Sequence, residues 1–451
     1  MVAIERGGIV AALLPAAALV TAYLIDQPRV TLAALLGATV VIEADPVGLL
    51  PIGPSFYQPI RLGLTPTDVL LGLVVVGTAL ELIRTRSHPR GIGPMTLPLL
   101  ALAGAYAAGV ATGFFAGAPP NELFLSSVRM AHLLILPFVC VNLLRSTGDV
   151  RAFLTGAAGL AAFKAVTGLL AVAGGAGFAV EGATITFYEP LANWLILTFL
   201  LGVLAARIRR VPLPSWVYWT VPVAVGAFLL SYRRSFWLGA VFAVVLVGIV
   251  ASRRRGRAVL AIGTAGLLLV VVGSFTLGRS SEVQSPVLER ARSLEPGRLT
   301  ESSGDRYRLD EQSNVMDDLR RHPLTGLGMN VEWTARNPLS EEHDRNYVHV
   351  VLLWYWLKLG LLGVIAFVWL YAMAVWTAFR VWGRHRDPLV RIGALAAGGG
   401  LAALAIVELT ASFTGVEPRL TTAFGALLGW VAACWQGLPH GSSARATAST
   451  E

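Results

Sequence analysis

Long apolar runs recur along almost the whole chain, and they constrain its fold more than any other feature. Hydrophobic residues make up 55% of the 451 residues and charged residues only 14%, far from the averages of soluble domains. Most runs are close to the roughly 20 residues that a helix needs to cross a bilayer. The sequence therefore predicts an all-α polytopic membrane protein, a bundle of about 12 to 13 transmembrane helices. The runs fall near 8–24, 66–83, 94–117, 127–144, 150–173, 191–206, 215–231, 235–250, 258–278, 347–379, 392–411 and 420–436.

The N-terminal part leaves two topologies open. The first run is followed by further spans and lacks a convincing small-residue cleavage site, so we do not read it as a removable signal peptide. A shorter apolar piece at 30–42 is followed by a stretch rich in Pro and Gly. If 30–42 crosses the bilayer fully, the N-terminus lies outside. If this piece is re-entrant, the N-terminus is cytoplasmic.

The distribution of charge predicts the orientation of the spans. Residues 279–345 hold 13 of the 27 Asp and Glu residues and 10 of the 36 Lys and Arg residues, so their net charge is −3 while the rest of the chain carries +12. Cytoplasmic loops carry the Lys and Arg excess, so we expect this segment outside. The basic residues lie in short clusters between spans rather than on one soluble face, which argues against a nucleic-acid partner. These clusters lie near 84–90, 145–151, 207–210, 253–257 and 380–391.

The resulting organisation has four parts. We expect an N-terminal transmembrane bundle at 1–278 and an extracytoplasmic loop containing short helices at 279–346. C-terminal transmembrane helices follow at 347–436. The remaining 437–451 is rich in Ser, Ala and Thr and is predicted to be a disordered cytoplasmic tail.

Two adjacent arginines, Arg233 and Arg234, lie between two apolar runs on the predicted outer face. Positive charges there run against the orientation rule, so they are functional candidates. One interpretation is an interfacial anchor that reaches lipid headgroups. The other is a two-pronged clamp on a diphosphate, a task that suits the planar guanidinium group.

The long loop contains a predicted helix from Arg308 to Arg321 that is stopped by Pro323. Its apolar stripe would comprise Leu309, Val315, Met316 and Leu319. Arg306 and Arg308 lie at the start of this helix, where the helix dipole disfavours cations unless an anion binds there. The alternative is that both are exposed loop arginines.

His349 begins the span after the loop and is followed by Trp354, Tyr355 and Trp356. The aromatic residues are typical of a membrane-interface belt. A histidine at a water-facing membrane edge can take a proton from a hydroxyl near neutral pH, although a hydrogen-bonded structural role is the alternative. The preceding turn, 323–328, lacks the Lys-Ser/Thr of a phosphate-binding loop.

Four ionisable residues fall inside predicted spans, where each should face the bundle interior or a wet cavity. Arg129 and His132 are spaced i,i+3 on one helix face and could help to bind an anion. Lys164 and Glu408 could form a structural ion pair. The sequence has no His/Cys cluster with metal-ligand spacing, no Asp-x-Asp pair on a cytoplasmic loop and no Gly-x-Ser-x-Gly, so we expect neither a metal nor a cofactor.

Several short motifs, in this order, resemble the O-antigen ligase and polymerase family of bacterial membrane glycan transferases. In that family an Arg-small-x-aromatic-Leu motif opens a span, a long periplasmic loop carries an Arg before a Pro-Leu-x-Gly-x-Gly turn, and a His precedes a Gly-Leu-x-Gly span. The resemblance covers roughly 230–365, about a third of the chain. The matching segments are Arg234-Ser235-Phe236-Trp237-Leu238, the loop helix from Arg308, Pro323-Leu324-Thr325-Gly326-Leu327-Gly328, and His349 followed by Gly360-Leu361-Leu362-Gly363.

The resemblance implies a metal-independent, multi-pass glycosyltransferase of the bacterial plasma (inner) membrane with its active site on the extracytoplasmic side. Such proteins transfer or polymerise a glycan from an undecaprenyl diphosphate carrier onto a hydroxyl of a glycan, lipid or other acceptor. It implies that Arg234 and Arg308 bind the diphosphate and that His349 activates or orients the acceptor. Further diphosphate-binding candidates are Arg233, Arg306 and Arg129.

Several alternatives stay open. Arg306 could replace Arg308 as the loop arginine, and His343 could replace His349 as the base. Gln312 replaces the usual aromatic residue of the loop helix. Val350 stands where the family often has Asn, which predicts a more apolar site beside His349. The rival class is a polytopic transporter or flippase for a lipid-linked or small anionic substrate, in which 12 or more spans and buried charges are ordinary.

Overall fold

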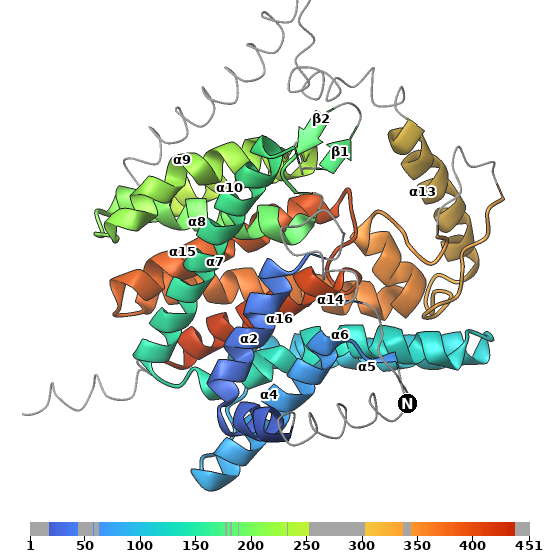
Figure 1. Cartoon of the computed structure of the whole chain (residues 1–451). Helices are drawn as coiled ribbons and strands as arrows, with labels where there is room; N and C mark the ends of the chain where they lie inside the picture. The colour runs from blue at the N-terminus through green and yellow to red at the C-terminus, as the bar shows by residue number, and fades with distance from the viewer. Residues whose placement is uncertain are drawn as a thin grey trace, which may run out of the picture.

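The protein is a helical bundle with a short hairpin and one polar helix outside the bundle (Figure 1). A computed structural model describes residues 18–43, 57, 63–175, 178–180, 183–187, 189–231, 233–251, 303–336 and 344–437. The strands within them are β1 (Phe178–Val180) and β2 (Ala183–Ile185), which pair antiparallel. The helices are α2 (Pro28–Val41), α4 (Pro66–Arg84), η2 (Gly93–Met95), α5 (Thr96–Phe115), α6 (Pro120–Leu143), α7 (Thr147–Ala173), α8 (Pro190–Arg209), α9 (Ser215–Leu229), α10 (Arg234–Ala251), α13 (Ser303–Arg321), α14 (Val351–Arg384), α15 (Pro388–Glu408) and α16 (Pro418–Gln436).

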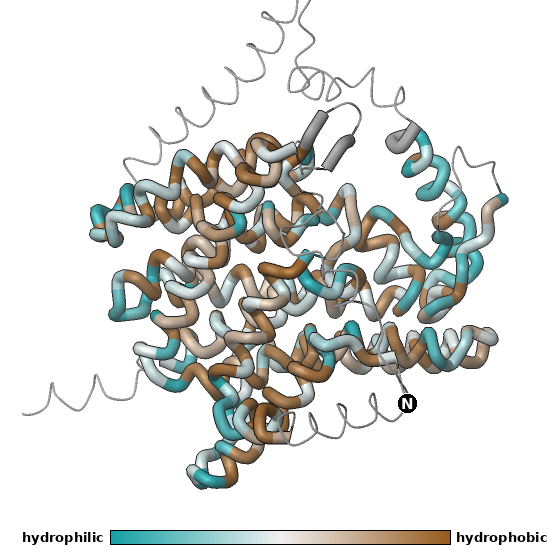
Figure 2. Tube along the Cα trace, in the orientation of Figure 1, coloured by the Kyte–Doolittle hydropathy of each residue, from teal (hydrophilic) through white to brown (hydrophobic). Residues whose placement is uncertain are grey.

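The predicted class, an all-α polytopic membrane protein, is confirmed. Within the described residues eight helical segments are long and apolar enough to cross a membrane, or nine if one bent pair counts as a span. Ten predicted runs coincide with helices, while 258–278 and most of 8–24 lie outside the described residues. Two features of the helices lower the number of spans further. Helix α9 has only 15 residues, and α16 begins with a polar turn. Figure 2 shows hydrophobic residues throughout the bundle and hydrophilic ones along α13.

Proline and capping residues begin many of the helices. Thr65 and Asp68 form a reciprocal capping box at the start of α4, and Ser146 and Asp149 form another at the start of α7. Such boxes satisfy backbone N–H groups that have no partner in the first helical turn. Proline stands in the first turn of α2, α4, α6, α8, α15 and α16, where its missing N–H costs nothing.

Helix α15 occupies the centre of the bundle and packs against α14, α10 and α8. Glycines allow these close approaches, since a Cβ on Gly400 would stand 2.3 Å from Thr198 Oγ1 and one on Gly399 would stand 2.6 Å from Val247. In lipid, small residues of this kind promote helix association by letting backbones come together.

The N-terminal apolar piece is not a straight span. The helical segment Ala18–Asp26 and α2 meet at an angle of 106°, which makes them a broken span or a re-entrant segment. With 14 residues, α2 is about 21 Å long, short of the roughly 30 Å hydrocarbon core. The geometry fits the half-span alternative, and the side on which the N-terminus lies stays a prediction.

The predicted ion pair between Lys164 and Glu408 is wrong. Lys164 pairs instead with Glu43, just after α2. Glu408 accepts hydrogen bonds from the Tyr371 hydroxyl at 3.0 Å and the Thr414 backbone N–H at 2.6 Å. The two residues belong to different helices, and each has a nearer partner of its own. The positions of the spans in the sequence do not tell which helices meet, so they could not predict these partners.

The predicted anion site on α6 is also not formed as expected. His132 is buried, with Nε2 2.9 Å from Asp68 Oδ1 and Nδ1 2.8 Å from Thr422 Oγ1. It therefore ties α6 to α4 and α16, while Arg129 one turn earlier is exposed.

Candidate functional site

His349 lies where the polar loop enters α14, and Glu311 of α13 holds it there. The His349 backbone N–H donates to Glu311 Oε2 at 2.8 Å, and its ring Nδ1 lies 3.1 Å from both carboxylate oxygens. The Glu311 side chain is fully buried, whereas 18% of the His349 side chain is exposed. One carboxylate therefore fixes both the backbone and the ring of His349.

This contact also fixes which ring nitrogen is basic. An ionised carboxylate can only accept hydrogen bonds, so we assign the ring proton to Nδ1. The lone pair then belongs to Nε2, for which no partner is recorded among the described residues. A carboxylate that sets the tautomer of a histidine in this way is the arrangement found behind general bases.

Two tyrosines flank the imidazole. The Tyr347 ring lies 4.9 Å from the His349 ring and the Tyr307 ring 5.8 Å from it, both edge to face. The Tyr347 hydroxyl donates to Ser412 O at 3.1 Å, which connects the loop to the chain between α15 and α16. The ring of His349 is therefore held on two sides as well as at Nδ1.

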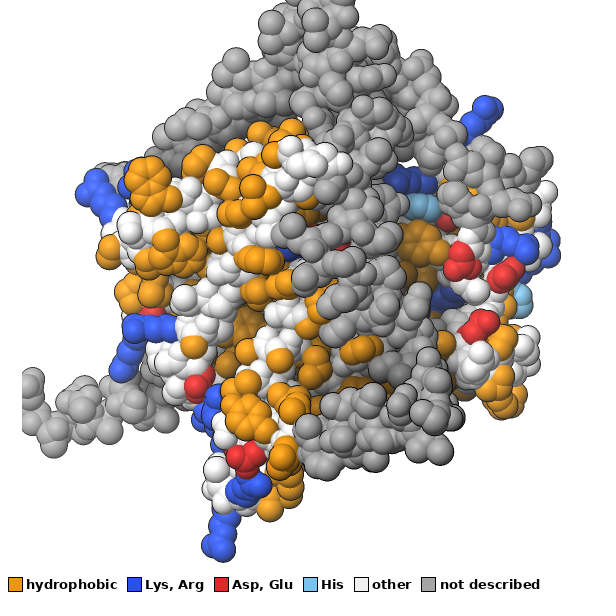
Figure 3. Space-filling model, in the orientation of Figure 1, with side chains coloured by type: hydrophobic (Ala, Val, Ile, Leu, Met, Phe, Trp, Pro, Cys, Tyr) orange, Lys and Arg blue, Asp and Glu red, His pale blue; other side chains and the backbone are white. Residues whose placement is uncertain are grey.

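Arg308 lies one helical turn before Glu311 on α13, directly after Tyr307. Burial raises the pKa of Tyr347 to about 12, the charge of Glu311 adds to this increase, and the charges of Arg308 and Arg233 oppose it. Both arginines therefore belong to the electrostatic environment of the tyrosine that contacts His349. Figure 3 shows Lys or Arg, Asp or Glu and His side chains gathered on the α13 side of the molecule.

The other predicted arginines differ in exposure. Arg234 is the first residue of α10 and is half-buried, as are Arg233 and Arg308. The Arg233 carbonyl accepts from Phe236 N at 3.0 Å and so begins the helix. Arg306 is exposed, which favours Arg308 as the loop arginine. His343 lies outside the described residues.

Glycines join the loop to a break in α14. Gly360 has φ 70° and ψ −173°, so α14 is interrupted there. The turn after α13 fills the break, because Leu327 N–H donates to Leu357 O at 2.7 Å and Leu361 N–H donates to Leu324 O at 3.0 Å. A Cβ on Gly360 would stand 2.1 Å from Leu324 O.

A buried lysine and glycines of α5 fix the same turn from the bundle side. Lys358 Nζ donates to Val331 O at 2.6 Å. Met329 N–H donates to Gly109 O at 2.9 Å, and a Cβ on Gly113 would stand 2.1 Å from Met329 O. A Cβ on Gly326 would likewise stand 2.4 Å from Leu357 O, and one on Gly328 would stand 2.4 Å from Gly113 N, which gives a physical reason for the glycines of this turn.

The inner face of α13 is more polar than the sequence predicted. Val315 and Leu319 are buried as expected, but Leu309 is 52% exposed. Asn314 and Asp318 accept instead from the backbone N–H groups of residues 336 and 334 at 2.8 Å. The helix packs against returning chain whose backbone needs acceptors, and a hydrophobic stripe could not supply them.

The sequence did not predict that Glu311, Tyr307 and Tyr347 surround His349. Glu311 stands three residues after Arg308, so the two lie on one face of α13. Nothing local connected that face to His349, which is 38 residues away.

Residues 219–368 match the sequence model of the O-antigen ligase family. Over this segment, about a third of the chain, the protein is similar to the O-antigen ligases. No curated protein in the comparison matches the chain. The match supports a membrane glycan-transferring or ligase function, which implies a lipid-linked glycan and an acceptor as partners in general.

The segment that matches the O-antigen ligases contains most of the candidate site. It includes Arg233, Arg234, Arg308, Glu311 and His349, together with the turn and the break in α14. Arg129 lies outside it. Among the described residues there is no group of three or more His, Cys, Asp and Glu side chains that could hold a metal ion.

Proposed function

We propose that this protein transfers or polymerises an undecaprenyl-diphosphate-linked glycan onto a hydroxyl acceptor at the outer face of the bacterial plasma membrane. The observation that carries the proposal is the junction of α13 with α14. There Glu311 holds His349, and Arg308 lies one helical turn before Glu311 on α13, at the end of the acidic segment predicted to lie outside.

In the proposed reaction, His349 Nε2 accepts the proton of the acceptor hydroxyl. The acceptor oxygen forms a bond to the anomeric carbon of the glycan, and the bond from that carbon to the diphosphate oxygen breaks. Undecaprenyl diphosphate leaves with the bonding electron pair. General-base catalysis of this kind contributes typically about 10² to 10⁴-fold.

Arg308, Arg233 and Arg234 would bind the diphosphate and stabilise the charge that develops on it. Guanidinium groups fit phosphate oxygens bidentately, and donors placed before the reaction stabilise the transition state without reorganisation. Each charge-assisted contact is worth about 1.5 to 3 kcal/mol. Glu311 acts through His349 and is therefore a positioning residue.

The transporter or flippase alternative drew on the buried charges Lys164 and Glu408. Lys164 pairs with Glu43, and Glu408 accepts from Tyr371 and Thr414. Since these charges have partners inside the bundle, they no longer argue for a translocation path.

A reconstituted system separates the two functions. The full chain in proteoliposomes is given an undecaprenyl-diphosphate-linked glycan and a glycan or lipid acceptor. The proposal predicts release of undecaprenyl diphosphate together with a new glycosidic product. Movement of the intact lipid-linked glycan between leaflets, without its cleavage, would support transport instead.

A further inference from the structure

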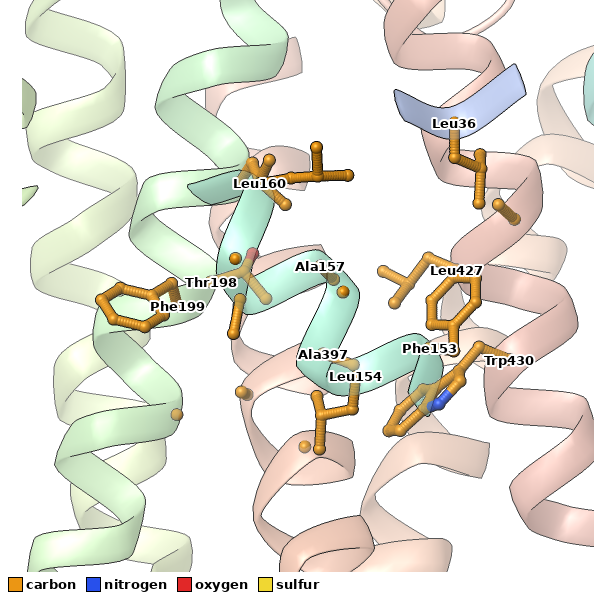
Figure 4. A pocket seen from close by; sticks show the side chains of 18 of the residues that line it. Leu36, Phe153, Leu154, Ala157, Leu160, Thr198, Phe199, Ala397, Leu427 and Trp430 are labelled. Atoms are coloured by element: carbon orange, nitrogen blue, oxygen red, sulfur yellow. The ribbon is translucent and has the colours of Figure 1, made fainter. Parts of the chain in front are cut away.

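A large apolar cavity lies between α2, α7, α8, α15 and α16, on elements other than those that carry His349 (Figure 4). Its volume is about 680 Å³, more than four times the roughly 150 Å³ of an engineered cavity that binds benzene. The described lining residues include none from α13 or α14. Its only charged lining residues in the described part of the chain, Arg29 and Asp149, both lie in the first turn of their helices.

Small residues keep this space open. Gly156 and Gly159 of α7 and Gly37 of α2 all line the cavity, and a Cβ added to any of them would meet nothing within 4 Å. The hydroxyl of Thr198 also lines the cavity, but it donates to Trp194 O at 2.8 Å. Figure 4 shows Leu, Ala and Phe side chains on the remaining walls. The walls therefore offer contact to hydrocarbon and little to a polar ligand.

The depth of the cavity restricts what can occupy it. Helices α7, α8 and α15 are all long and apolar enough to span a membrane, so the cavity lies at membrane depth. Protein interiors are normally close-packed, so an empty space of this size needs an occupant. Water does not suit it, because a buried water needs two to four polar partners that these walls do not provide. The surrounding solvent at this depth is lipid hydrocarbon, which matches the apolar walls of the cavity.

Arginines crowd at one end of the cavity. The Arg29 side chain is 50% exposed and pairs with Glu81 at 3.1 Å and Asp149 at 3.7 Å. Arg29 Nε donates to Leu143 O at 3.3 Å and Arg145 Nε donates to Asn142 O at 2.9 Å, while the Arg90 backbone N–H donates to Asn142 Oδ1 at 2.8 Å, so the three arginines meet at the end of α6. Burial lowers the pKa of Arg145, the charges of Arg90 and Arg29 lower it further, and the charge of Glu81 opposes them. Three cations face two carboxylates, which leaves this rim positive. A positive rim above an apolar cavity is complementary to an anionic lipid.

We propose that this cavity binds an acyl chain of an anionic bilayer phospholipid, with the phosphate at the Arg29 rim. The lipid is separate from the glycan carrier of the proposed function, and it stabilises the bundle by filling a space that the helices leave empty.

Leucine substitutions at the open glycines test the proposal directly. In Gly156→Leu and Gly159→Leu the new side chain occupies the cavity. Gly104→Leu on α5 is the matched control, because Gly104 also has nothing within 4 Å but does not line the cavity. The purified full chain is mixed with palmitoyl-oleoyl phosphatidylglycerol and examined by native mass spectrometry. We expect one retained lipid in the wild type and Gly104→Leu, and occupancy lower by about tenfold in the other two, which is about 1.4 kcal/mol.

Thermal unfolding gives a second measurement. Added phosphatidylglycerol should raise the Tm of the wild type and Gly104→Leu, while Gly156→Leu and Gly159→Leu should show little dependence on lipid. Full lipid retention by both cavity variants would overturn the proposal, as would equal loss in the control. Displacement of the lipid one-for-one by undecaprenyl phosphate would assign the cavity to the carrier instead, and a lipid-free dimer would assign it to a second copy.

If the leucine variants do not fold, the wild type still decides the question. Phosphatidylglycerol with a photoreactive group at the chain end should label residues within 153–160 or 194–203, which line the cavity. Labelling confined to other helices would contradict the proposal. None of these three measurements depends on glycan transfer, so failure of the lipid proposal is distinguishable from failure of the proposed function.

Discussion

Glu311→Gln should nearly abolish glycan transfer while leaving the fold intact. The Glu311 carboxylate accepts from two N–H groups of His349, its backbone N–H at 2.8 Å and its ring Nδ1–H at 3.1 Å. A glutamine side chain has similar shape but only one oxygen and a donating NH₂ group. If its oxygen keeps the backbone bond, its NH₂ faces Nδ1 and favours the tautomer in which Nε2 carries the proton. His349 then loses its basic site.

The size of the effect follows from these contacts. Loss of one charge-assisted hydrogen bond costs about 1.5 to 3 kcal/mol, or roughly 10 to 150-fold in rate at 1.4 kcal/mol per factor of ten. A wrong tautomer removes the general base altogether, which is worth about 10² to 10⁴-fold. We therefore expect turnover to fall by about 10² to 10⁴-fold. The double variant with His349→Ala should be no slower than His349→Ala alone, because both changes remove one function.

The assay is transfer from an undecaprenyl-diphosphate-linked glycan in proteoliposomes, with donor binding measured separately. Asp317→Asn is the matched control: it removes a carboxylate from the same helix, where Asp317 pairs with the exposed Arg320 at 2.9 Å. Near-normal transfer by Glu311→Gln, or an equal loss in Asp317→Asn, would refute the role of Glu311 as a positioning residue.

Three further predictions concern the arginines, the break in α14 and the tyrosine beside His349. Arg308→Lys keeps the charge but loses the two-pronged contact, so transfer should fall by about 10 to 150-fold; the same change at exposed Arg306 should have little effect, and equal losses in the two variants would contradict this. Gly360→Ala places a Cβ 2.1 Å from Leu324 O at a φ of 70°, so it should lower the free energy of unfolding by about 1 to 3 kcal/mol, measured as a lower Tm. Gly383 on the same helix has open space around it, so Gly383→Ala should leave the Tm unchanged. Burial raises the pKa of Tyr347 from 10.0 to about 12, so the stability that the neutral hydroxyl contributes is full below pH 10 and is lost as the pH rises towards 12. In Tyr347→Phe the free energy of unfolding should fall less between pH 10 and pH 12 than in the wild type. An unchanged pH dependence would contradict the burial of this hydroxyl.

Membrane class and helix positions were predictable because hydrophobic runs alone determine them. The end of α13 before Pro323 followed from the sequence for a similar local reason. The partners of Lys164 and Glu408 did not follow, because pairing depends on which helices meet and at what depth.

Glu311 illustrates what the sequence could not disclose. Its position on α13 gave no sign that it is fully buried against a histidine 38 residues later. That contact forms only because the turn after α13 enters the break at Gly360 and brings the chain back along the helix. Three glycines with positive φ, at 326, 328 and 360, make that path possible.

Single-turnover transfer by His349→Ala and His343→Ala at equal abundance, with donor affinity measured in parallel, decides whether His349 is the base for a hydroxyl acceptor. We predict that His349→Ala binds the lipid-linked donor nearly as well as the wild type but transfers about 10² to 10⁴-fold more slowly, while His343→Ala transfers normally. Near-normal transfer by His349→Ala, with the loss falling on His343→Ala, would contradict the account and move the base into the loop.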